Sequence, residues 1–426
     1  MNVQNHKMPQ NFYVDLLDRV GNSDVGIVFG GGQKRHVIVG LKFSEVDPQI
    51  VSKLSLCAAK APLGAMPCQS GIFGLLSYDD MVAKKVVQSR FFALHKFVVI
   101  DRKAGRYSIV DNGEVASEFD CSHILDATTG LRVTEAAAQR LEPTHSDADY
   151  LASVERVLAD IRSGRYYQLN LIRQFRFVST PSHTDIAARY AQYSGNQGCW
   201  LKVPGLEVVS FSPETFLTYQ REAEASVLSA WPIKGTIPRG YDPESDALRL
   251  DTLLRSAKDD AELSIIIDLM RNDLNVVCQR GSVRVAQSKS VRKTRTVHHL
   301  EAKISGVLAN PTPLMDLFGV VGPCGSITGA PKAEVIKAIG EFEPSRRGFF
   351  MGSAFLFDSL LGTLDSSILI RTIVNSNGTY RYAAGSGIVV SSDPQSELEE
   401  VNAKCAILTQ HHSHLTAEEE ERIYPV

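Results

Sequence analysis

The chain has 426 residues, of which 44% are hydrophobic and 22% charged, and this is the balance of a soluble globular protein long enough to bury a core. The formal net charge is only −3, from 45 basic and 48 acidic residues spread along the sequence, which excludes the strong positive field of a nucleic-acid-binding protein. Apolar runs are broken before membrane-spanning length and the seven cysteines form no CxxC pairs, so we expect a cytoplasmic protein with reduced thiols and no membrane contact.

The first part of the chain, to about residue 144, predicts antiparallel strands. Short β-like runs at 25–29, 37–43 and 97–100 alternate with glycine and aspartate, which favour turns. This part carries little chemistry that the sequence alone identifies.

The second part mixes helices and strands. Apolar residues from Tyr150 to Ile161 recur at helical spacing after Asp147, which predicts an amphipathic helix that ends near Gly164 and leads into a strand at 166–177. Further helices are expected at 246–267 and 397–410, and β-rich runs at 206–219, 283–285 and 381–390. Because strands do not alternate regularly with helices, an α+β layered fold is favoured over a doubly wound parallel sheet.

A glycine-rich loop at 325–332 combines two glycines, two hydroxyls and Lys332 just before a predicted helix at 333–339. Backbone amides at a helix start can bind a carboxylate or a phosphate. The phosphate-binding Walker pattern is absent, because Lys332 neither follows a glycine nor precedes serine or threonine. A plain turn with a helix cap explains the loop equally well.

Two acidic segments and one lysine could also carry chemistry. Acids at both ends of the apolar run 261–273 should be ion-paired or bound to a hard cation, since burying an unpaired carboxylate is costly. Glu400 and Lys404 lie on one helical face, so a plain surface ion pair is an even alternative for them. Lys234, between Ile233 and Gly235, could act as a nucleophile if confined, although a solvated charge at a strand end is the commoner case.

Taken in this order, these segments resemble the family of chorismate-utilising enzymes. The resemblance rests on short motifs between about residues 166 and 408, at 167–171, 212–214, 232–236, 262–273, 299–300, 325–332, 343–348, 366–371, 385–389 and 393–404, and more weakly at 71–79. It implies an anthranilate-synthase-like α+β fold, with two stacked antiparallel β-sheets and helices packed on the outside. It also implies one domain over 1–426, made of a weakly matching part at 1–144 and a catalytic region at 145–410.

The resemblance also implies a site. Two glutamates at family positions, Glu262 and Glu400, would bind Mg²⁺, a cation that accepts a few carboxylates and keeps several waters. His299 would lie against the substrate ring. The groups that would bind the carboxylates of chorismate are Thr328, Arg371, Lys404 and the backbone amides of Gly385 and Gly387.

Three residues indicate which reaction of the family to expect. Members that add water carry a lysine base where this chain has Gln168, and glutamine cannot take a proton from water. Members that aminate chorismate at C4 carry a lysine at the position of Lys234, which would attack C2, whereas alanine there is typical of members that make anthranilate. Glu214 would be the general acid that protonates the departing C4 hydroxyl.

The expected activity is therefore the amination of chorismate to 4-amino-4-deoxychorismate, on the way to 4-aminobenzoate and folate. No segment resembles a glutaminase, so a separate glutamine amidotransferase subunit would deliver the ammonia. The alternatives are amination at C2 to give anthranilate, and a non-catalytic chorismate-binding regulator. Retention of Glu214, Lys234 and both glutamates argues against the regulator.

Overall fold

The structure is a computed structural model of the chain. It describes residues 2–8, 12–30, 36–56, 70–113, 117–125, 135–222, 224–294, 297–410 and 412–413.

Ten α-helices and two 3₁₀ turns occur within these residues. They are α1 (Phe12–Asn22), α2 (Pro48–Val51), α3 (Tyr78–Ala83), η1 (Ser122–Leu125), α4 (Asp147–Arg162), α5 (His183–Tyr193), α6 (Pro243–Leu254), α7 (Ala257–Val277), α8 (Leu314–Val321), η2 (Gly325–Ile327), α9 (Lys332–Phe342) and α10 (Pro394–Thr409).

Hydrogen bonds join most of the described strands into one branched network. Its first half runs, in order of pairing, through β10 (Leu141–Pro143), β11 (Gln168–Phe177), β24 (Thr379–Val389), β23 (Thr372–Ser376), β13 (Leu206–Ser210), β12 (Cys199–Val203), β2 (Gly26–Phe29), β3 (His36–Glu45) and β6 (Arg90–Asp101). Its second half continues from β6 through β5 (Gly71–Leu76), β21 (Ser353–Asp358), β22 (Thr363–Ile368), β14 (Thr215–Glu222), β15 (Ala225–Ala230) and β18 (Val297–Val307), and β18 also pairs with β16 (Ile233–Pro238) and β17 (Arg284–Lys293).

Eight further strands complete the described set. The branches are β1 (Asn2–Lys7), β7 (Arg106–Asp111), β8 (Phe119–Asp120) and β20 (Gly329–Ala330), and the separate pairs are β4 (Ser55–Leu56) with β19 (Thr312–Pro313) and β9 (Glu135–Ala136) with β25 (His412–Ser413).

All pairings between the described strands are antiparallel, which confirms the expected α+β class with antiparallel strands. The hydrogen bonding does not divide them into two sheets, because the 12-residue strand β6 pairs with β3 on one side and with β5 and β7 on the other. Most strands of the first 144 residues therefore lie in the same network as the strands of residues 145–410, the exceptions being β4 and β9.

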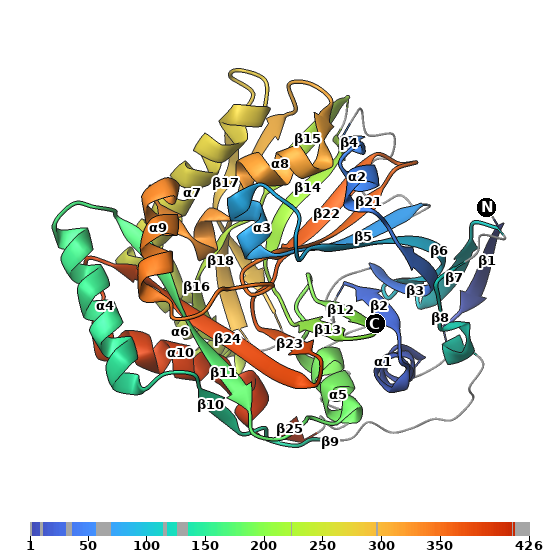
Figure 1. Cartoon of the computed structure of the whole chain (residues 1–426). Coiled ribbons are helices and arrows are strands. Elements are labelled where there is room, and N and C mark those ends of the chain that lie inside the picture. Colours follow the sequence, from blue (N-terminus) through green and yellow to red (C-terminus); the bar gives the residue numbers. More distant parts are fainter. Residues whose placement is uncertain are drawn as a thin grey trace.

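Helices cover the outside of this network (Figure 1). α4, α7, α9 and α10 lie on one side of the molecule, at the left of the view, and the strands β1, β3, β7 and β8 lie on the other. α4 begins with a capping box, in which Ser146 and Asp149 each bind the other's backbone amide, as its sequence predicts. One continuous core reaches from Phe43 and Phe92 near the N-terminal strands to Trp200 and Tyr382.

The expected helix at 246–267 is two helices. α6 ends at Leu254, and Ser256 then starts α7, with its hydroxyl accepting a hydrogen bond from the Asp259 amide. A serine that accepts from a first-turn amide stabilises a new helix start better than a helix interior, which explains the break. α7 then runs on to Val277, ten residues beyond the expected end.

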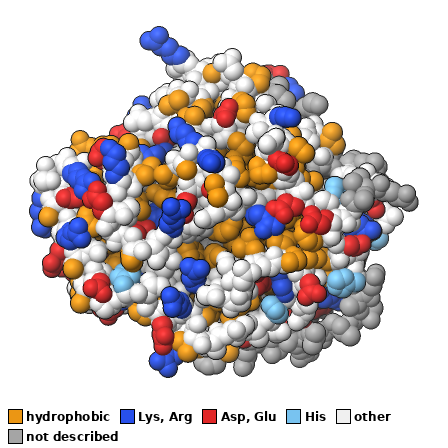
Figure 2. Space-filling model, in the orientation of Figure 1, with side chains coloured by type: hydrophobic (Ala, Val, Ile, Leu, Met, Phe, Trp, Pro, Cys, Tyr) orange, Lys and Arg blue, Asp and Glu red, His pale blue; other side chains and the backbone are white. Residues whose placement is uncertain are grey.

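The surface fits the modest net charge. Acidic and basic side chains are interspersed over the face shown in Figure 2, with apolar side chains between them. Within the described residues, no helix has both the length and the apolar composition that a membrane span requires.

Candidate active site

A cavity of about 830 Å³ lies where the two ends of the strand network meet. Its wall includes β24 and β11 from one end of the network and β16 and β18 from the other, and the helices α7 and α10 contribute acids to it. The volume is in the range of small-molecule sites. The predicted site residues that line it are Glu214, Lys234, Glu262, His299, Arg371, Gly385, Gly387, Glu400 and Lys404.

Glu214 lies in the turn between β13 and β14 and is 5% exposed. Its Oε1 accepts a hydrogen bond of 2.8 Å from the Ser326 hydroxyl and a longer one, 3.4 Å, from the Ile233 amide. Burial raises the pKa of Glu214, and the Ser326 hydrogen bond and the charge of Lys234 oppose that rise. A carboxyl whose protonated form is favoured in this way can serve as a general acid.

Lys234 lies at a bulge of β16. The pairing with β18 shifts between Lys234 and Thr236, and Gly235 has a φ of 75°, a conformation that glycine adopts readily. A Cβ on Gly235 would lie 3.1 Å from the Asp259 side chain. Both this close contact and the positive φ therefore disfavour a larger residue at this position. The Lys234 amine lies 3.4 Å from the Cβ position of Gly387 on β24. The bulge therefore brings the amine across the cavity to the opposite end of the strand network.

His299 on β18 is 2% exposed. Burial lowers the pKa of His299 to about 3, and the nearby charges of Arg371 and Arg292 add to this effect. The ring is thus neutral at physiological pH. Its Nδ1 lies 2.8 Å from the Thr236 hydroxyl, which fixes the orientation of the ring from the neighbouring strand.

Basic and backbone groups gather where the resemblance places the substrate carboxylates. Arg371 has a φ of 50°, which is unusual for a residue other than glycine and is found most often at functional sites. Lys404 donates to the carbonyl of Gly385 at 2.7 Å and to Glu400 Oε1 at 2.6 Å. Glu400 and Lys404 thus form the i,i+4 ion pair that the sequence left open as an alternative, and both side chains also line the cavity. Gly387 leaves open the space that a side chain would fill between Gln168 and Lys234.

The acids of the cavity fit a divalent cation. Lys234, Arg371 and Lys404 line the wall together with the carboxylates of Asp259, Glu262 and Glu400, so three positive and three negative charges balance if Glu214 is protonated. A dicarboxylate substrate would then add two uncompensated negative charges. Within the described residues, no group of three or more His, Cys, Asp or Glu is arranged to hold a metal ion, and Mg²⁺ binding by Glu262 and Glu400 stays a prediction.

The glycine-rich loop forms part of the wall through Ser326 and Ile327. Thr328 is fully buried and donates to the carbonyl of Cys324 at 2.8 Å; it does not line the cavity, and its role in binding stays a prediction. Lys332 points elsewhere, since it pairs with Asp273 at 2.6 Å. The lysine therefore fixes the loop to α7.

The loop is held from behind by a buried ion pair. Arg347 pairs with Glu343 and donates to the carbonyls of Ile327 and Asn170, at 2.8 and 2.7 Å. A buried arginine that binds two carbonyls from separate segments fixes their relative position. This accounts for the motif at 343–348, which lies outside the cavity wall.

Sequence reasoning missed several residues of the wall. Asn170 on β11 and Asp259 on α7 line the cavity, and Ser326 binds Glu214. Gln168 is fully buried, and neither atom of its side-chain amide has a hydrogen-bond partner among the described residues. Because side chains alternate between the two faces of a strand, Gln168 and Asn170 lie on the same face of β11. The sequence could therefore have predicted that these two side chains lie together.

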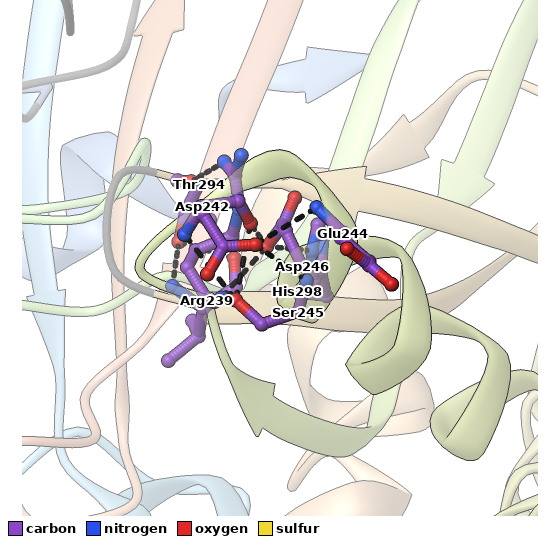
Figure 3. A network of polar contacts seen from close by, with 9 residues as sticks. Arg239, Asp242, Glu244, Ser245, Asp246, Thr294 and His298 are labelled. Carbon is purple, nitrogen blue, oxygen red and sulfur yellow. Dashed lines mark hydrogen bonds and ion pairs between the residues drawn. The ribbon is translucent and has the colours of Figure 1, made fainter.

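A second polar network surrounds His298, the sequence neighbour of His299 on β18 (Figure 3). Asp246 at the start of α6 binds the buried ring of His298, the Arg239 side chain and the Gly240 amide, and Arg239 also donates to the carbonyl of Thr294. These bonds lower the pKa of Asp246, with Arg239 as the main cause. The network ties the ends of β16 and β18 to α6, and so supports the strands that carry Lys234 and His299.

Some known proteins are similar to this chain in sequence, and others are similar to it in fold. A family profile described as chorismate binding enzyme matches residues 33–410. The probable chloroplastic aminodeoxychorismate synthase of Oryza sativa subsp. japonica is 37% identical over 317 residues, which are 72% of this chain and 33% of the rice protein. Aminodeoxychorismate synthase component 1 of Salmonella typhimurium is 31% identical over 347 residues, 79% of this chain and 75% of that protein.

Among solved structures, anthranilate synthase component I from Streptococcus pneumoniae matches with a TM-score of 0.73 at 21% identity, over 89% of this chain and 93% of that one. At this identity the match shows a common fold. The chain thus spans a third of the length of the rice protein and three quarters of that of the Salmonella protein. Because the family profile covers most of the sequence and its motifs surround one cavity, the chain belongs to the chorismate-binding enzymes.

Proposed function

We propose that this chain aminates chorismate at C4, giving 4-amino-4-deoxychorismate. The observation that carries the proposal is the presence of Lys234 in the same cavity as the buried carboxyl of Glu214. The names of the rice and Salmonella relatives, both aminodeoxychorismate synthases, support it.

Substrate binding would use the groups around β24. Arg371, Lys404 and the amides of Gly385 and Gly387 would bind the two carboxylates of chorismate, and Thr328 would support the loop beside them. His299, being neutral, would pack against the ring without adding a charge. Glu262 and Glu400 would hold Mg²⁺, which supplies positive charge for a substrate carboxylate.

The chemistry would take two displacements. In the first, the amine of Lys234, once it has released its proton to solvent, bonds to C2, the ring double bond shifts, and the C4–O bond breaks while Glu214 gives its proton to the hydroxyl, which leaves as water. In the second, ammonia bonds to C4, the double bond shifts back and the bond between C2 and Lys234 breaks. The surplus proton on the new amino group returns to Glu214, which restores the site.

The ammonia would come from a separate glutamine amidotransferase subunit. The Salmonella relative is named component 1, which supports a two-component enzyme. The product would lead to 4-aminobenzoate and folate.

Two alternative functions would not require the cavity residues Lys234 and Glu214 in the same way. Amination at C2 to give anthranilate needs no lysine nucleophile, so it leaves Lys234 without a role. A chorismate-binding regulator would have no need for the buried Glu214 beside that lysine. Addition of water is disfavoured, because Gln168 lies where a base would be required.

Analysis of the product tests the proposal. The protein is incubated with chorismate, ammonium and Mg²⁺, and the products are separated and identified by mass spectrometry. The 4-amino product is expected. Anthranilate or isochorismate as the main product would contradict the proposal.

A further inference from the structure

A partly buried ion pair lies beside the turn that carries Glu214. Arg292 on β17 and Glu301 on β18 pair at 3.2 Å between Nε and Oε2, and their side chains are 16% and 13% exposed. Arg292 also donates from Nη2 to the carbonyl of Pro213 at 2.8 Å. Pro213 directly precedes Glu214, so this bond holds the backbone of the turn that carries the acid.

The register of the hairpin explains why these groups meet. Arg292 is directly opposite His299 across the β17–β18 pair, and directly opposed residues share a face of a sheet. His299 and Glu301, two residues apart on β18, also share that face. The face that presents His299 to the cavity therefore carries the ion pair that contacts the turn before Glu214.

The pair also affects the charge around Glu214. The groups that act on its carboxyl are Ser326 and the Ile233 amide through hydrogen bonds, and Lys234 and Arg292 through charge. Arg371 and Cys324 also interact with Glu214. Arg292 forms an ion pair with Glu301, and each of the two shifts the pKa of the other toward its charged form.

We propose that Arg292, held by Glu301, is a positioning residue that orients the Ser212-Pro213-Glu214 turn for proton donation to the leaving hydroxyl. The inference rests on the proposed role of Glu214 as general acid. Arg292 has two distinguishable effects on Glu214. Its hydrogen bond to the Pro213 carbonyl places the carboxyl, and its positive charge favours the ionised form of that carboxyl. The negative charge of Glu301 weakens the second effect.

The pH dependence of turnover provides the test. A general acid works when protonated, so kcat falls as the pH rises above its pKa. Glu301→Gln leaves the charge of Arg292 uncompensated and should move this fall to lower pH by roughly 0.5 to 1 unit, whereas Arg292→Met should move it to higher pH by a similar amount. Arg292→Met should also lower kcat about tenfold with little change in KM, because the bond to Pro213 is lost.

The measurement uses the full-length protein with chorismate and Mg²⁺, with free ammonia held constant across the pH series. Glu222→Gln is the matched control. Glu222, at the end of β14, pairs at 2.9 Å with Lys303, which lies on β18 like Glu301. Because Glu222 does not contact Glu214, this substitution should leave the pH profile unchanged. Arg292→Lys keeps the positive charge. The pH at which kcat falls should therefore return close to the wild-type value, whereas kcat itself should recover less.

The inference is overturned if Glu301→Gln and Arg292→Met both fold, as judged by thermal unfolding, and both keep the wild-type pH profile. If Arg292→Met does not fold, Glu301→Gln alone decides, because its side chain keeps the shape of glutamate. The main product of the wild-type protein is a separate readout. Anthranilate as that product would contradict the proposed function, while the shift of the pH profile would still report on Arg292.

Discussion

At the scale of single residues, burial determines the protonation of the cavity groups. His299 and Glu214 are both nearly inaccessible, and for each the largest influence on the pKa is burial, which favours the neutral form. The site thus combines a neutral imidazole with a carboxyl held toward its protonated form. These are the states that a ring contact and a general acid require.

The pKa of His299 has a consequence for stability. A histidine in the unfolded chain titrates near pH 6.5, whereas the folded protein lowers the pKa of His299 to about 3. Between these values the unfolded state binds one more proton, so stability falls as the pH drops, by up to about 1.4 kcal/mol per unit for this group. His299→Gln should make that fall shallower in urea unfolding measured from pH 7 to 4.5.

The matched control for this experiment is His123→Gln, because His123 is exposed on η1. It should keep the wild-type slope. Equal slopes for the wild-type protein and His299→Gln would contradict the account of His299.

All the site residues predicted from the sequence except Thr328 line the cavity, but the sequence could not distinguish the roles of the two hydroxyls in the glycine-rich loop. Both Ser326 and Thr328 lie in a motif of small residues, and only the turn of η2 decides that Ser326 reaches Glu214 while Thr328 binds Cys324. Arg292 and Asp259 were not identified, since their proximity to the site depends on strand pairing and helix packing over long sequence separations.

At the scale of elements, one buried arginine binds the C-terminal end of α10. Arg189 on α5 is 1% exposed and donates to the carbonyls of Ile407 and Gln410, at 2.5 and 3.2 Å, and to that of Ala137 at 2.5 Å. These last-turn carbonyls have no partner within the helix. The arginine thus satisfies them and fixes the helix that carries Glu400 and Lys404.

Arg189→Met should destabilise the protein by about 2 to 4 kcal/mol, because it leaves buried carbonyls without donors. The midpoint of urea unfolding measures this. Arg176→Met is the control, since Arg176 is exposed on β11, and should change stability by less than about 0.5 kcal/mol. An equal midpoint for both variants would show that α10 does not need the arginine.

Most of the elements that the sequence predicted are present, and the exceptions have local causes. The helix of α4 was predicted from its cap and its period, whereas the expected helix at 246–267 ignored Ser256, whose hydroxyl starts α7. The bulge at Gly235 could not be predicted, because a bulge is defined by the partner strand.

At the scale of the whole molecule, the cavity exists because a long path of strands returns on itself. β11 and β24 at one end of the path and β16 and β18 at the other supply opposite walls. Local sequence patterns cannot predict that these two ends meet, because many strand pairings separate them along the network.

The glutamates from two separate helices make Mg²⁺ binding a test of this arrangement. Mg²⁺ together with chorismate should raise the thermal unfolding temperature of the wild-type protein, since a ligand of the folded state stabilises it. Glu262→Gln and Glu400→Gln should lose most of this increase and most of the activity. Glu399→Gln, an exposed neighbour on α10, should keep both. Full turnover in excess EDTA would contradict the prediction.

The central claim is that Lys234 is the nucleophile that directs amination to C4. The most direct measurement is the rate and the product of Lys234→Ala with chorismate, Mg²⁺ and saturating ammonium, compared with the wild-type protein. Formation of the 4-amino product should fall by on the order of 10²-fold or more, as for the loss of a catalytic nucleophile or proton-transfer group, while chorismate still binds through Arg371 and Lys404. Direct attack of ammonia at C2 would then give anthranilate as the residual product. An undiminished yield of the 4-amino product from Lys234→Ala would contradict the claim.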